Sequence, residues 1–80
     1  MEVTKRIALK QGTMAKISEV LKNNLFTLLE NSWLYTDDLG MESMKVTYKL
    51  EEDEVILSAW MVTEDMQILL DKIENEIING

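Results

Sequence analysis

The segment from Met44 to Met61 reads MKVTYKLEEDEVILSAWM and decides the predicted fold. Apolar side chains recur at every second position on both sides of the acidic run Glu51–Glu54, a pattern typical of two half-buried strands. An antiparallel hairpin around this run has four apolar rungs, which are Leu50 with Val55, Tyr48 with Leu57, Val46 with Ala59, and Met44 with Met61. Because side chains alternate between the faces of a sheet, this register places all eight on one face.

The other face of the predicted hairpin is also partly apolar. Ile56, Trp60 and Val62 lie on it, across from Lys49, Lys45 and Ser43. We therefore expect another element or another molecule to cover this face.

Two segments have the spacing of amphipathic helices. From Met14 to Leu29 the apolar residues recur every three to four positions after Thr13, a suitable N-cap, although Asn23 and Asn24 favour a bend or an early end near Lys22. A second helix is predicted after Thr63, where Glu64 and Asp65 favour a helix start, and its apolar stripe ends at Asn79.

The remaining segments complete an α+β fold. Residues 3–9 alternate like a half-buried strand but are too few to exclude a frayed helix, and residues 33–35 form a candidate third strand beside 44–50. The predicted fold is a long N-terminal helix, a two- or three-stranded antiparallel meander containing hairpin 44–61, and a C-terminal helix. On so narrow a sheet only one helix fits the Met44 face, so the second covers the Trp60 face or crosses to a neighbouring subunit.

Composition limits the classes of function. The chain has 80 residues, which suit a single domain spanning 1–80, and a core of this size is often supplemented by oligomerisation. With no Cys and no His, disulfides are excluded, and zinc or haem sites are disfavoured, so we expect no cofactor. No long apolar run predicts a signal peptide or a membrane span, so we expect a cytoplasmic protein.

The net charge of −7 is unevenly distributed along the chain. Residues 1–36 carry a net charge of +2, whereas residues 37–80 carry −9. Direct binding to nucleic acid is disfavoured, because the acidic half repels phosphates. A basic protein partner fits this charge better.

Our first hypothesis is a small acidic interaction protein, a homodimer, that binds another protein and regulates or inhibits it without chemistry. The predicted apolar contact consists of Ile56, Trp60, Val62, Ile68 and Ile78. The acids predicted to steer a basic partner are Glu51, Glu52, Asp53, Glu54, Glu64, Asp71 and Glu74. General acid–base or nucleophilic catalysis has no converging set of groups, so we expect no enzyme.

Two alternatives remain open. The same acids favour a mimic of the nucleic-acid backbone that inhibits a nucleic-acid-binding protein, and the size and acidity of the chain resemble those of small phage or mobile-element proteins. In addition, the segment 36–44, TDDLGMESM, resembles the D-L-G-x-D-S-L segment of acyl and peptidyl carrier proteins. That resemblance implies attachment of a phosphopantetheine arm at Ser43.

Overall fold

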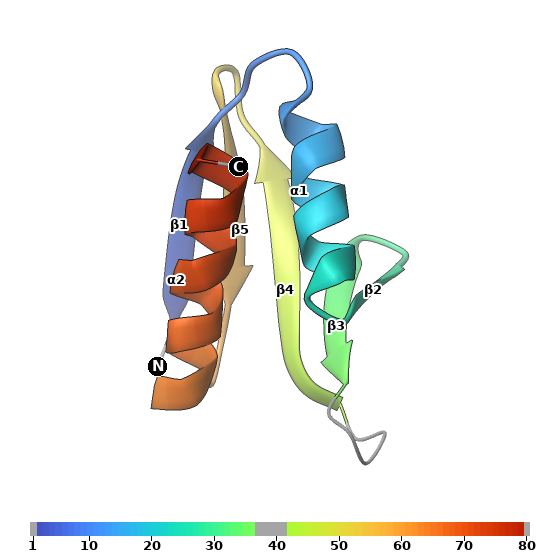
Figure 1. Ribbon diagram of the computed structural model, residues 1–80, viewed down its shortest axis with the longest axis vertical. Coiled ribbons are helices and arrows are strands. Elements are labelled where there is room, and N and C mark those ends of the chain that lie inside the picture. The colour runs from blue at the N-terminus through green and yellow to red at the C-terminus, as the bar shows by residue number, and fades with distance from the viewer. Residues whose placement is uncertain (1, 37–41, 80) are drawn as a thin grey trace.

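A computed structural model of the chain describes residues 2–36 and 42–79, and of residues 42 and 43 it describes the backbone alone. Its five strands form one antiparallel sheet, with two helices packed on the sheet (Figure 1). In chain order the elements are β1 (Val3–Ala8), α1 (Thr13–Asn23), β2 (Phe26–Leu29), β3 (Ser32–Thr36), β4 (Glu42–Leu50), β5 (Glu54–Ala59) and α2 (Glu64–Asn79).

The order of the strands across the sheet is β1-β5-β4-β3-β2. The predicted hairpin is present as β4 and β5, and three of its four rungs are confirmed: Val46 opposite Ala59, Tyr48 opposite Leu57, and Leu50 opposite Val55. The fourth rung, Met44 with Met61, is wrong. Strand β5 ends at Ala59, and Met61 has a positive φ of 57°.

The predicted long N-terminal helix and narrow meander are wrong, because the sheet has five strands. Helix α1 ends at Asn23, so of the two outcomes predicted near Lys22 the early end is the one observed. Leu25 then adopts a φ of 72°, which an α-helix does not accommodate, and β2 follows. The segment 3–8 is strand β1, paired with β5, and 32–36 is strand β3, paired with β4.

The two helices begin in different ways. Thr63 accepts a hydrogen bond from the backbone N–H of Met66 at 3.3 Å, as expected for the N-cap of α2. The N-cap of α1 is instead Gly12, with a φ of 86°, and Thr13 is the first helical residue. The Thr13 hydroxyl accepts from the Lys10 N–H and donates to the Ala8 carbonyl, so it fastens the β1–α1 connection rather than capping the helix.

Both helices lie on the same face of the sheet (Figure 1). Helix α2 buries Leu70, Ile73 and Ile77, and α1 buries Ile17, Val20 and Leu21, against strand residues that include Val46 and Leu57. The sequence predicted one helix on this Met44 face, with the second on the Trp60 face or crossing to a neighbouring subunit. The place predicted for the second helix is wrong, because both helices pack on the Met44 face. Five strands provide the width for two helices, and each strand beyond the third adds about 5 Å.

The opposite face of the sheet has no described element packed on it. We call it the uncovered face. The residues whose side chains lie on it include Thr4, Arg6, Ser32, Leu34, Lys45, Thr47, Lys49, Ile56 and Ser58, and none of these is buried.

Candidate interaction surface

The five residues of the predicted apolar contact do not form one patch. Ile56 lies half-buried on the uncovered face, and Trp60 follows the end of β5 with 52% of its surface exposed. Ile68 and Ile78 are exposed on the outer side of α2, in the other layer of the molecule. Val62 is only 6% exposed and belongs to the core, so it has no surface to offer a partner.

The predicted steering acids are also divided. Glu51, Glu52 and Asp53 are exposed in the β4–β5 turn, at the end of the molecule where α2 finishes, whereas Glu64 begins α2 at the opposite end (Figure 1). Glu54 pairs with Arg6 across the β1–β5 ladder.

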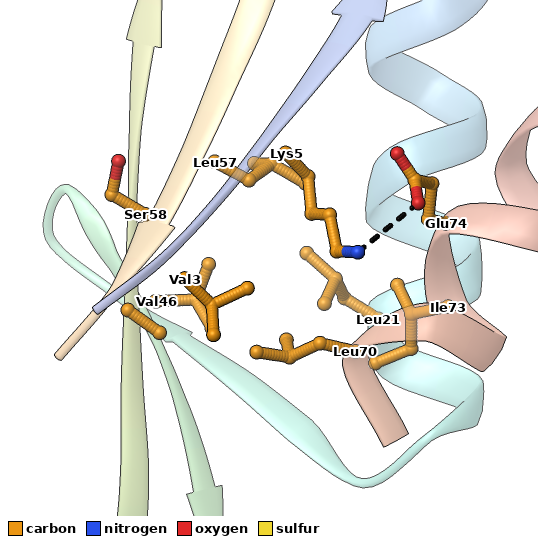
Figure 2. A pocket seen from close by; sticks show the side chains of 10 residues that line it. Val3, Lys5, Leu21, Val46, Leu57, Ser58, Leu70, Ile73 and Glu74 are labelled. Atoms are coloured by element: carbon orange, nitrogen blue, oxygen red, sulfur yellow. Dashed lines mark ion pairs between the residues drawn. The ribbon is translucent and has the colours of Figure 1, made fainter. Parts of the chain in front are cut away.

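Asp71 and Glu74 are held by Lys5 of β1. The Lys5 Nζ lies 2.5 Å from Asp71 Oδ1 and 3.2 Å from Glu74 Oε1, and Figure 2 shows the second of these pairs. The pKa of Lys5 is raised above its ordinary value of 10.5, chiefly by the hydrogen bond to Asp71, while burial acts in the opposite direction. These two acids therefore fasten α2 to β1, and their charge is partly neutralised within the chain.

A small internal void lies beside this ion pair and is too small for a ligand. It lies between the helices and strands β1, β4 and β5, and Val3, Leu21, Val46 and Leu70 are among its lining residues (Figure 2). Its volume of about 10 Å³ is roughly that of one water-sized probe. The interior of the molecule therefore offers no binding site here.

The strand register assembles a row of hydroxyl groups across the uncovered face. Thr4 of β1 is opposite Ser58 of β5, Ser58 is opposite Thr47 of β4, and Thr47 is opposite Ser32 of β3. We call these four residues the hydroxyl row. At about 4.8 Å per strand it extends for about 14 Å.

Cations and apolar side chains flank the hydroxyl row on both sides. On one side Arg6, Ile56 and Lys49 are opposite one another, and on the other side Lys45 is opposite Leu34. The sequence prediction placed Ile56 across from Lys49, as observed, but missed the hydroxyl row. The pairing of β1 with β5 and the register of β3 on β4 could not be seen in the sequence.

An open hollow lies at one end of the hydroxyl row. Leu29, Glu30, Ser32, Leu34 and Lys45 line it, and its volume is about 290 Å³. Ser32, Leu34 and Lys45 stand on the uncovered face, so the hollow can receive a side chain that approaches from that face. Leu29 and Leu34 are the apolar residues of its lining.

The surroundings of Ser43 differ from those of the carrier-protein serine. In that family the serine opens a helix, whereas here Ser43 belongs to strand β4. Of the resembling segment, residues 37–41 lie outside the described residues. Within the described part of the chain, no group of three or more acidic side chains could hold a metal ion.

No protein-family model matches the chain, and neither the curated proteins nor the solved structures include a match. Among the described residues, no helix is long and apolar enough to cross a membrane.

Proposed function

We propose that this protein is a non-enzymatic interaction module that docks another protein on its uncovered face and thereby regulates or inhibits it. The observation that carries the proposal is that both helices pack on one face of a five-stranded sheet, while Ile56 and Leu34 stand on the other. A sheet face that keeps apolar side chains without a covering element of its own chain is a candidate docking surface.

A substitution at the centre of the uncovered face tests this proposal. Thr47→Arg places a long side chain in the middle of the hydroxyl row, where the Thr47 hydroxyl now donates to the Ser58 carbonyl at 3.4 Å. Immobilised wild-type protein and this variant are each exposed to a lysate of the organism that encodes the chain, and captured proteins are identified by mass spectrometry. We expect a protein retained by the wild type to be lost from Thr47→Arg.

The matched control is Ile68→Arg, on the outer side of α2. Ile68 is 67% exposed and lies in the other layer, so this variant introduces the same group without touching the uncovered face. Retention of the same protein by Ile68→Arg and its loss from Thr47→Arg support docking on the uncovered face. Equal capture by all three proteins overturns it.

The homodimer is a second proposal, and a different observation favours it. Strand β2 is at one edge of the sheet, and Leu25, Leu28 and Leu29 in and beside it are large exposed apolar residues. Edge strands are usually protected by charge, proline or a covering element, and Leu25–Leu29 contains no charge and no proline. Pairing with β2 of a second copy covers this edge.

A further inference from the structure

We infer that the segment docked on the uncovered face is acidic and extended, with an apolar side chain in the hollow beside Leu34. This inference rests on the proposed function and adds the chemistry of the partner. It reverses the expectation of a basic partner, because the charge of the uncovered face is opposite to that of the whole chain.

The charge of the uncovered face favours an acidic segment. The described strands place three cations on the uncovered face, Arg6, Lys45 and Lys49, and one acid, Glu54, which pairs with Arg6. The strands therefore give this face a positive charge in a protein of net charge −7. Lys45 makes no ion pair with any described acidic side chain. Lys49 pairs with Glu51 at 3.1 Å, but the side chain of Lys49 is 73% exposed, so solvent screens that contact.

The spacing of the two lysines on β4 suits an extended segment. Lys45 and Lys49 are four residues apart on β4, which places their backbones about 13 Å from each other on the same face. The hydroxyl row crosses β4 between them at Thr47. An extended segment with acidic residues about four positions apart can therefore bring a carboxylate to each lysine, while its backbone and small polar groups meet the hydroxyls.

The side chains around the lysines favour an acidic protein segment over nucleic acid. The hollow beside Lys45 is lined by Leu29 and Leu34, which suit an apolar side chain, and Glu30 on its rim repels a phosphate. Ile56 stands between Arg6 and Lys49 and supplies apolar area where single-stranded nucleic acid needs an aromatic platform. These features favour a protein segment that combines carboxylates with apolar side chains.

The test uses a synthetic probe and the isotopically labelled protein. A short capped peptide with two glutamates four positions apart and a leucine two positions beyond one of them, so that all three share one face when it is extended, is titrated into the protein, and amide chemical shifts are followed by NMR. We expect shifts in the amides of β4 and β5, centred on Thr47 and Ser58, and an affinity that falls with added salt. The same peptide with lysine in place of glutamate and a short oligothymidylate serve as alternative probes, and neither is expected to produce these shifts.

Charge reversal identifies the cations. In K45E/K49E we expect the affinity for the acidic peptide to fall about tenfold. The matched control K16E/K22E makes the same change of net charge on α1 and should retain the wild-type affinity. If K45E/K49E does not give a folded spectrum, Lys45→Gln with Lys49→Gln replaces it. Equal affinity in wild type and K45E/K49E, shifts outside the uncovered face, or stronger binding of oligothymidylate overturns the inference.

The lysate capture separates this inference from the proposed function. A protein that is lost from Thr47→Arg but retained by K45E/K49E docks on the uncovered face without using the lysines, and only the acidic chemistry is then overturned. A protein retained by both variants overturns the proposed function itself. Loss from both variants, with retention by K16E/K22E, supports the acidic segment.

Discussion

The protonation of Lys5 is linked to the stability of the fold. Its side chain is 19% exposed, and the hydrogen bond to Asp71 raises its pKa in the folded state. A raised folded pKa stabilises the protein at every pH below the pKa of the unfolded state, and the stabilisation is lost as the pH rises through the folded pKa.

We predict that Lys5→Met lowers the free energy of unfolding by about 0.5–1 kcal/mol at pH 8, the size of a partly exposed ion pair. The difference between the two proteins should diminish once the pH passes the folded pKa of Lys5. Urea unfolding of both proteins over an alkaline pH series measures this difference, and Lys22→Met at the exposed end of α1 is the control. A difference that stays constant through the alkaline series would contradict the role of the Lys5 charge.

Met61 explains why the sequence predicted the wrong neighbours for Val62. If β5 continued to Val62, Val62 would lie on the same face as Ile56. The backbone of Met61 is instead in the left-handed region, and Met61 is 89% exposed. The chain turns there, which brings Val62 into the core immediately before the cap of α2. Alternation along a strand cannot predict a turn that contains neither glycine nor proline.

At the scale of elements, the parts predicted well are those with a strong local pattern. The register of three hairpin rungs followed from apolar pairing, and the start of α2 followed from Thr63 and the acids after it. The sequence did not predict strand β2, because Leu25, Leu28 and Leu29 continue the three- and four-residue spacing of the apolar residues in α1. A strand of four residues is too short for its own alternation to compete with that spacing.

Asn24 is the residue that ends α1 and joins it to α2. Its buried amide donates to the Val20 carbonyl at 2.8 Å and to Glu76 Oε2 at 3.4 Å, and Lys72 Nζ donates to Asn24 Oδ1 at 3.4 Å. A side chain that meets both a helix carbonyl and the neighbouring helix fixes where the helix ends, which is information that residue spacing does not contain.

We predict that Asn24→Ala lowers the free energy of unfolding by about 1–2 kcal/mol, because a helix-end carbonyl and two side chains on α2 lose a partner. The control is Asn23→Ala, at the exposed preceding position, which should change stability by less than about 0.5 kcal/mol. Thermal and urea unfolding followed by circular dichroism compare the two variants. Equal effects of both substitutions would show that Asn24 does not have this role.

At the scale of the whole molecule, the sequence alone could not predict how charge is distributed between the sheet and the layer of helices. The sequence shows an acidic chain, but the register of β1, β4 and β5 gathers Arg6, Lys45 and Lys49 on one face. The width of the sheet was equally hidden, since β1 is distant in sequence from β5, its neighbour in the sheet. Long-range pairing therefore produced both the uncovered face and its charge.

The edge at β2 allows a prediction about assembly. A continuous sheet formed by two copies has its twofold axis perpendicular to the sheet, so residues whose numbers share parity meet across the new edge. Leu28 then lies opposite Leu28 or opposite Phe26 of the second copy, depending on the register. Both pairings are apolar, and no like charges face each other within β2.

We predict that the wild-type protein sediments as a dimer at high concentration and that Leu28→Lys sediments at the monomer mass of 9.3 kDa. In the first register the lysines of the two copies face each other at the twofold axis, which brings two like charges together. In the second register each lysine faces Phe26 of the other copy and loses contact with water. Either outcome opposes pairing of the two β2 strands. Leu50→Lys is the control, because Leu50 is an exposed leucine at the end of β4 and lies away from the β2 edge. A wild type that is monomeric at every concentration, or a Leu28→Lys variant that still dimerises, would rule out this edge as the dimer contact.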